Sequence, residues 1–180
     1  MDVSIVDVAN LFVFVEAKSL GLKGNETIEE LDANSEARER LEAIRGIAAQ
    51  KVGYVDNYQD AFEKTPAVPK IAIVAGPAGT EQPDLHVRMM SMKFTHKTFA
   101  VTGGMCVAAA AAIPGTIVNR IALQNPRFQL AQINVAHPGG MMDVGVNTAQ
   151  ENGEIVIKST SGFSTARLLM EGIAYYPCSR

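Results

Sequence analysis

The sequence predicts an α+β domain in which many strands wrap around a few helices, one of which is buried. Residues 99–115, FAVTGGMCVAAAAAIPG, begin like a strand, continue as a helix that is apolar on every side, and stop at Pro-Gly. A helix without a polar face is usually buried, so this one is expected at about residues 103–113 inside the fold. β-rich segments occupy both ends of the chain, and Asn152-Gly153 between two of them is a strong hairpin signal.

The N-terminal third is expected to contain extended segments followed by one amphipathic helix. Residues 3–16 read as extended, with a break at Ala9-Asn10 before the β-rich LFVFV, and KSLGLKGNETIEEL reads as a loop with a short helical turn. Asn34 or Ser35 can cap the helix that follows, and Gly53 ends it. Its apolar face consists of four residues at helical spacing: Ala37, Leu41, Ile44 and Ala48.

The rest of the chain is expected to be mainly extended, apart from the buried helix. Residues 54–69 contain proline and should be irregular, and KIAIVAGPAG is a short buried strand that ends in a Gly-Pro loop. Residues 84–101 form a long extended stretch that leads into the buried helix. Four further strand candidates follow that helix: 128–137, 141–147, 154–160 and 172–176.

Composition limits the classes of function. The 180 residues, 47% hydrophobic and 19% charged, suit one globular domain or two small ones with a real core. A net charge of −3 without any long basic cluster argues against nucleic acid or an acidic membrane surface as a partner, while small anions remain possible. Two cysteines are too few for a disulfide framework, and the N-terminus has no basic leader, so we expect a cytoplasmic protein.

The front end of the buried helix is the first candidate site. Amides in the first turn of a helix have no partner within the helix, and Gly103 and Gly104 remove side chains that would block access to them. The sequence therefore suggests an anion site at Thr102-Gly103-Gly104, which the helix dipole would favour. The alternative is that Thr102 caps the helix and the glycines only make a tight turn.

Other candidates lie close to this helix in the sequence. Cys106 could act as a nucleophile or proton shuttle if the helix start stabilised its thiolate, or it could be a small buried hydrophobe. His96 and Lys97 could flank an anion at the glycines, or they could belong to a solvated strand end. His137 in the loop HPGG could reach a ligand or lie at a distant end of the sheet.

Two polar residues interrupt otherwise apolar patterns. Asn10 needs a partner within its strand, which would be backbone or a ligand. Arg167 falls in the first turn of a possible helix capped by Ser164 or Thr165, where a cation is unfavourable, so a carboxylate of the protein or of a substrate should pair with it. The histidines do not show metal-ligand spacing, and no metal site is expected.

Several of these motifs together resemble a known family. MSMKFTHKTFAVTGGMCVAAAAAIPGTIVN, NVAHPGGMMDVGV and STARLLMEG are similar, in order and spacing, to the C-terminal half of the PrpF-type isomerases, and VDVANLFVFVEAKSLGLKGNE to the strand that begins that half. This group includes 2-methylaconitate cis–trans isomerase and relatives that act on 3-methylitaconate, aconitate and 4-oxalomesaconate. The resemblance covers nearly the whole chain.

The resemblance implies a diaminopimelate epimerase-like fold, in which each of two domains wraps a barrel-like sheet around a central helix. Residues 1–180 would be one such domain, with the last strand, about 171–180, packing on a missing N-terminal domain. The helix end from Thr102 to Met105 would hold a substrate carboxylate in the cleft. Asn10 stands where the epimerases have the Asn of an Asn-Pro-His element, although Leu11 replaces the proline.

The resemblance also implies how the chemistry is divided. Thr102 occupies the place of a catalytic cysteine in the epimerases, and its hydroxyl is too weak an acid for proton transfer. The parent enzyme would move or rotate a C=C bond of a small di- or tricarboxylate by removing and returning a proton, without metal or organic cofactor. The lysine and cysteine thought to move the proton belong to the N-terminal domain, so this chain would supply the carboxylate-binding half.

Two other functions are considered. The chain alone could be a non-catalytic carboxylate-binding or dimerising domain, which would form homo-oligomers or associate with an N-terminal half. An amino-acid racemase or epimerase is disfavoured because Thr102 carries no thiol.

Overall fold

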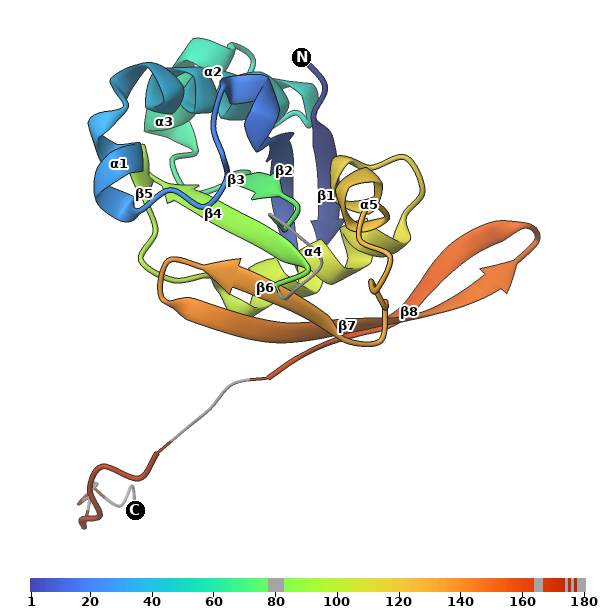
Figure 1. Cartoon of the computed structure of the whole chain (residues 1–180). Helices are drawn as coiled ribbons and strands as arrows, with labels where there is room; N and C mark the ends of the chain where they lie inside the picture. The colour runs from blue at the N-terminus through green and yellow to red at the C-terminus, as the bar shows by residue number, and fades with distance from the viewer. Residues whose placement is uncertain (78–82, 164–166, 174, 176, 178–180) are drawn as a thin grey trace.

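One curled, mixed β-sheet organises the domain (Figure 1). The computed structural model describes residues 1–77, 83–163, 167–173, 175 and 177. The strand order is β1-β2-β3-β4-β6-β7-β8, with β5 paired to β4; β2 runs parallel to β3 and β4 to β6, whereas the other neighbours are antiparallel. The strands are β1 (Ser4–Val8), β2 (Asn10–Glu16), β3 (Lys70–Ala75), β4 (Leu85–Ser91), β5 (Phe94–Thr95), β6 (Ile133–His137), β7 (Gly140–Glu151) and β8 (Glu154–Gly162).

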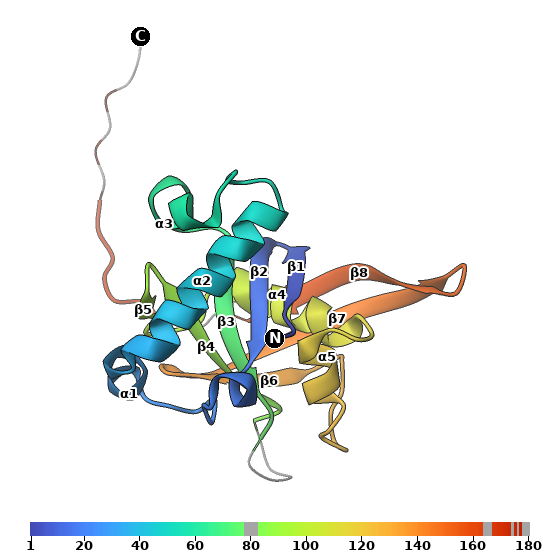
Figure 2. The same ribbon diagram turned by 90° about the horizontal axis from the view of Figure 1, so that it is seen from above.

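Helices cover both faces of this sheet. Figure 2 shows the long helix α2 (Ser35–Lys51) in front of β2 and β3 and the buried helix α4 (Val101–Ala112) behind them. The remaining helices are short: η1 (Ala17–Leu20), α1 (Ile28–Ala33), η2 (Tyr58–Asp60), α3 (Ala61–Lys64) and α5 (Ile117–Ala122). The α+β class and the diaminopimelate epimerase-like arrangement of a sheet around a buried helix are therefore confirmed.

Strand β2 explains how two cores share one sheet. Successive side chains of a strand point to opposite faces. Phe12 and Phe14 pack in the core that contains α4, whereas Val13 and Val15 pack in the core that contains α2. All four side chains are fully buried, which is why LFVFV is a continuous apolar run and shows no alternation of polar and apolar residues.

The N-terminal predictions hold. The break in residues 3–16 is at Ala9, whose φ of 61° lets β1 turn back onto β2. Helix α2 begins at Ser35 because the side chain of Asn34 accepts a hydrogen bond from the amide of Ala37 at 3.0 Å.

Residues 54–69 contain the short helices η2 and α3, so this segment is more ordered than expected.

The buried helix α4 begins at Val101, two residues earlier than the sequence suggested. Cys106 and the alanines after it are almost completely shielded from solvent, because small side chains let β2, β7 and β8 approach the helix closely. Gly115, with a φ of 83°, turns the chain after α4, and the hydroxyl of Thr116 caps α5 by accepting from the amide of Asn119.

The extended stretch 84–101 is divided by a turn. Met92 and Lys93 both have positive φ, 48° and 70°, and reverse the chain between β4 and β5. Neither residue is a usual turn former, so the sequence did not indicate this reversal.

Three of the four later strand candidates are observed, and β6 begins at Ile133, later than residue 128. Asn152 and Gly153, with φ of 52° and 84°, connect β7 to β8, and their hairpin extends beyond the body of the domain (Figure 1). In the expected strand 172–176, Ala174 and Tyr176 lie outside the described residues, and the other three are in no strand. None of the helices in the described ranges is long and apolar enough to cross a membrane.

Candidate functional site

The first turn of α4 has an open end. Ala100 occupies the N-cap position, and no side chain of a described residue caps the helix there. Thr102 is already the second helical residue and its side chain is exposed, so the alternative in which Thr102 caps the helix is wrong. The amide of Gly104 donates to the carbonyl of Ala100 at 3.0 Å. The amides without a helical partner are therefore those of Val101, Thr102 and Gly103, and the amide of Gly104 is not available to a ligand.

The two glycines serve packing more than access. A Cβ atom on Gly103 would lie 2.9 Å from Cζ of both Phe12 and Phe99. A Cβ atom on Gly104 would lie 2.6 Å from Sδ of Met142 and closer than normal contact to Val144. Both glycines are buried, so they let the helix lie against β2 and β7.

Asn10 lies at the end of the sheet where α4 begins. It is half-buried, is the first residue of β2 and pairs with Val8. Phe12, two residues further along β2, points to the same face and contacts α4 at Gly103. The side chain of Asn10 takes part in none of the hydrogen bonds found among the described residues. Asn10 and the first turn of α4 thus lie at the same edge of the domain.

Met105 is half-buried and lines the same first turns of α4. A Cβ atom on Gly162, the last residue of β8, would lie 3.8 Å from Cε of Met105 and 2.9 Å from Cγ1 of Val101. The end of β8 therefore covers one side of the helix start and leaves Thr102 exposed.

Cys106 does not fit a catalytic role. Its side chain is fully buried in the second turn of α4, and Sγ donates to the carbonyl of Val6 at 3.4 Å. Burial raises the pKa of the Cys106 thiol to about 12. The thiolate is not available near neutral pH, so the weak catalytic assignment of Cys106 is wrong and the residue is a small hydrophobe of the core.

His96, Lys97 and His137 are brought together by two loops. The amide of Thr98 donates to Nδ1 of His96 at 3.2 Å, and the side chain of Lys97 is exposed. A Cβ atom on Gly139 would lie 3.1 Å from the carbonyl oxygen of Lys97, so the turn after β6 packs against the loop that leads into α4. In that turn, the amide of Gly139 donates to Nδ1 of His137 at 3.1 Å.

Arg167 lies apart from this group. It is exposed and belongs to no helix, so the expected place in the first turn of a helix is wrong, and the proposed caps Ser164 and Thr165 lie outside the described residues. The described residues after Phe163 extend away from the body (Figure 1) and carry large exposed apolar side chains, with Leu168 at 81% and Met170 at 85% exposure.

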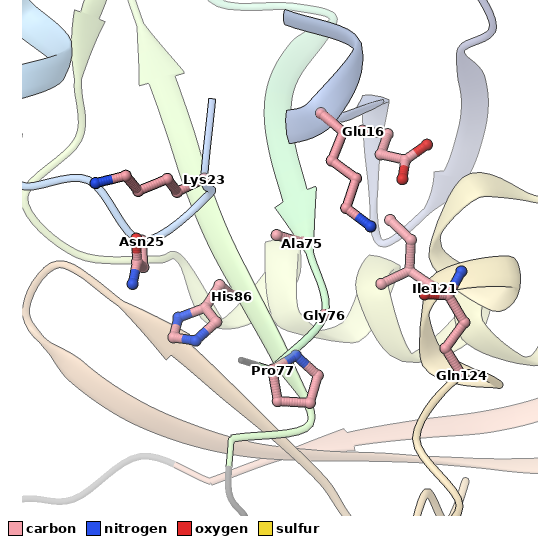
Figure 3. A pocket seen from close by; sticks show the side chains of 10 residues that line it. Glu16, Lys23, Asn25, Ala75, Gly76, Pro77, His86, Ile121 and Gln124 are labelled. Atoms are coloured by element: carbon pink, nitrogen blue, oxygen red, sulfur yellow. The ribbon is translucent and has the colours of Figure 1, made fainter. Parts of the chain in front are cut away.

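A cavity of about 330 Å³ lies at the C-terminal ends of β2 and β3, away from the end of β2 that carries Asn10 (Figure 3). In the close-up, the ring of His86 and the side chain of Gln124 border the cavity, whereas Lys23 extends away from it. Nδ1 of His86 is buried without a partner among the described residues, and burial, with a smaller contribution from Arg88, lowers the pKa of His86. The sequence did not single out His86 because it reads as one more residue of an extended segment.

A second cavity, also about 330 Å³, lies beside the first and shares Asn25 with it. It is lined by the loop that enters α1, by His137-Pro138 and by Arg88, which is only 6% exposed. Burial, with a smaller contribution from Arg88, lowers the pKa of His137. Arg88 was missed in the sequence because nothing in HVRMM separates a buried arginine from a solvated one.

The comparisons with known proteins agree with this architecture. The PrpF protein family matches residues 1–177. The chain is 35% identical to 3-methylitaconate isomerase of Eubacterium barkeri (97% of this chain, 47% of that protein) and 32% identical to 2-methyl-aconitate isomerase of Shewanella oneidensis (92% and 43%). It is also 32% identical to (4E)-oxalomesaconate Delta-isomerase of a Novosphingobium species (97% and 46%).

Among solved structures, a methylitaconate-delta-isomerase superposes with a TM-score of 0.74 at 34% identity, covering 91% of this chain and 45% of that one. This chain thus spans about half the length of the relatives it matches. The sheet encloses a helix with an open first turn, as described above. Together with the family match, which runs from the first residue to Pro177, this shows that the chain belongs to the PrpF family.

Proposed function

We propose that this chain is the carboxylate-binding half of an isomerase that moves or rotates a C=C bond of a small di- or tricarboxylate by removing and returning a proton. The open first turn of α4 carries this proposal, because the amides of Val101, Thr102 and Gly103 have no helical partner and no described side chain caps them. The relatives named as isomerases of methylitaconate, methylaconitate and oxalomesaconate support this class of substrate.

The proposed chemistry needs charge stabilisation from this chain. Removing a proton next to a carboxylate places negative charge on that carboxylate, and oriented amides at a helix start stabilise it. Losing one such donor typically lowers the rate by about 10²–10³-fold. Asn10 and Met105 line the same edge, and His96, Lys97 and His137 are candidates to hold the other carboxylates. The reaction needs no metal or organic cofactor.

The groups that move the proton are proposed to lie outside this chain. Cys106 is buried with a raised pKa, and the hydroxyl of Thr102 is too weak an acid. A second half would then supply the acid and base and cover the exposed apolar residues Leu168, Met170 and Ile173. Packing of residues 171–180 on that half remains part of this proposal.

Proton NMR in D₂O with this chain and aconitate, 2-methylaconitate or 3-methylitaconate tests the proposal. We expect saturable broadening of substrate signals without deuterium at the allylic position. Deuterium incorporation would mean that an acid–base pair lies within the chain and would contradict the division between halves. Absence of broadening for all three acids would contradict the binding role.

The exposed apolar residues after Phe163 also favour a second candidate, a dimerising domain that binds carboxylates without catalysis. Sedimentation of the chain should show self-association that disappears when residues 163–180 are removed. A monomer at high concentration would exclude dimerisation through this segment.

A further inference from the structure

Arg88 lies on the face of the sheet that is opposite to α4. Its neighbours Val87 and Met89 pack in the core that contains α4, so Arg88 points the other way. Arg88 pairs across the sheet with Ile73, a residue of the core that contains α2. The side chain of Arg88 therefore points away from α4.

The guanidinium of Arg88 is buried without an acidic partner. Nε donates to the carbonyl of Glu26 at 2.7 Å, and Nη1 donates to the carbonyls of Val87 at 3.0 Å and Ala136 at 3.5 Å. Arg88 forms no ion pair with a carboxylate in the described part of the chain, and its Nη2 has no hydrogen bond there. Buried charges are normally paired, because transfer out of water is costly.

Arg45 is a buried arginine of the same chain that does form an ion pair, and it serves as a comparison. Arg45 is 4% exposed, and its Nη2 lies 2.6 Å from Oε1 of Glu42 while Nε donates to Oε2 of the same carboxylate. Arg88 is buried to a similar degree, but its hydrogen bonds among the described residues go only to neutral carbonyls. Burial lowers the pKa of Arg88, and the charge of Glu26 offsets this in part. A bound anion would supply the hydrogen-bonded charge partner that Arg88 lacks among the described residues.

The cavity beside Arg88 offers space and a second donor. Because Nδ1 of His137 accepts from the amide of Gly139, the neutral ring carries its proton on Nε2 and can donate there. The carboxylate of Glu26 accepts from the amides of Lys23 at 2.5 Å and Gly24 at 2.8 Å, so backbone donors occupy both of its oxygens, and it forms no ion pair with Arg88 within the described residues. Glu29, the other acid in the wall, is exposed to solvent.

We propose that this cavity binds a small oxyanion, the carboxylate or phosphate group of a small molecule, with Arg88 as its charge partner and His137 as a second donor. Guanidinium groups bind both kinds of oxyanion through paired N–H donors. The cavity is not the first turn of α4, but it uses His137, which the proposed function also names as a candidate to hold a substrate carboxylate.

NMR titration tests this proposal on the chain as it is. Inorganic phosphate and, separately, citrate are added while the Nε–H signal of Arg88 and the ring signals of His137 are followed. We expect saturable shifts of both residues at millimolar concentrations of at least one anion. Shifts with citrate alone identify a carboxylate site, and shifts with phosphate identify a site for oxyanions more generally. Absence of saturable shifts with both anions would overturn the proposal.

Variants separate the cavity from general charge effects. Arg88→Gln should weaken binding at least about tenfold, whereas Arg120→Gln, which removes an exposed charge near Asp2, should leave affinity within about twofold. Equal affinity in a folded Arg88→Gln variant would contradict the assignment.

A second variant keeps the test decisive if Arg88→Gln does not fold, since Arg88 also holds the carbonyl of Glu26. His137→Ala removes one donor from the cavity without touching that contact, and we expect affinity to fall about three- to tenfold. In His137→Ala the Nε–H signal of Arg88 still reports binding, and unchanged affinity there would remove His137 from the site. Unchanged affinity in both variants would overturn the proposal.

Discussion

Individual residues decide which of the sequence candidates can act. Cys106 and Thr102 are four positions apart on α4, yet one is fully buried and the other is exposed. The sequence left two roles open for Cys106, a reactive thiol or a small buried hydrophobe, and placed Thr102 in a candidate anion site. Burial against Val6 makes Cys106 inert, whereas Thr102 lies where a ligand can reach its backbone.

The thiol of Cys106 should resist alkylation in the folded protein. With its pKa raised to about 12, the thiolate fraction is negligible at neutral and mildly alkaline pH. Iodoacetamide labelling followed by peptide mass spectrometry should leave Cys106 unmodified until denaturant is added. Rapid labelling of Cys106 in the native protein would contradict its placement, and the denatured protein provides the positive control.

Gly104 should not tolerate even one methyl group. In Gly104→Ala the new Cβ would lie 2.6 Å from Sδ of Met142, so the side chain or α4 must shift. Overpacking of this kind typically lowers the free energy of unfolding by about 1–3 kcal/mol, which exceeds the gain of about 1 kcal/mol from helix propensity. Urea unfolding measures the difference. Thr102→Ala, at an exposed position of the same turn, is the matched control and should change stability little.

Elements show how far local sequence patterns can predict this fold. Strands β1 and β2 follow from β-rich runs, helix α2 from apolar periodicity and from Asn34 as a cap, and the β7–β8 hairpin from Asn152-Gly153 as a turn. The turn at Met92-Lys93 carries no such signal, since its backbone is imposed by the pairing of β5 with β4. The start of α4 was placed two residues late because Thr102 resembles a cap.

A carboxylate at position 102 should affect stability and binding in opposite directions. In Thr102→Glu, the negative charge near the helix start should raise the free energy of unfolding by about 0.3–1 kcal/mol. The same charge repels an anion at the amides of Val101 to Gly103, and substrate affinity should fall about tenfold or more. Urea unfolding and NMR line broadening measure the two effects.

Thr102→Gln has a similar size and no charge, so it separates repulsion from steric blocking. A stability gain in Thr102→Glu without any loss of affinity would contradict a carboxylate site at the start of α4.

At the scale of the whole molecule, what the sequence could not show is which distant segments meet. Gly104 needs to be glycine because of Met142 and Val144, and Arg88 becomes a site because the loop before α1 and the turn after β6 close around it. None of these neighbours is near in sequence. The family resemblance predicted the α4 edge, but it assigned nothing to the outer face of β4.

Stability should fall as the pH decreases from neutral to about 5. Burial lowers the pKa of His86 and of His137 below the ordinary value of 6.5, so the unfolded chain binds more protons than the folded one in the interval between the two values. The two histidines contribute fully to the free energy of unfolding above their ordinary pKa of 6.5. This contribution is lost as the pH falls below 6.5 toward their lower pKa in the folded state.

Urea midpoints at about pH 7.5 and about pH 5 measure this loss. The double variant His86→Gln, His137→Gln should show a smaller difference between the two midpoints, because glutamine does not titrate. The same pH dependence in the double variant would assign the effect to other groups.

Strand β2 has both faces buried, one against α4 and the other against the core that contains α2. Because β2 belongs to both cores, it cannot unfold in one core and stay folded in the other. Neither layer can therefore exist as a folded half by itself, and a loosening that begins around α2 reaches the open turn of α4 through the backbone of Phe12 to Val15. The domain is one cooperative unit, despite having two interiors.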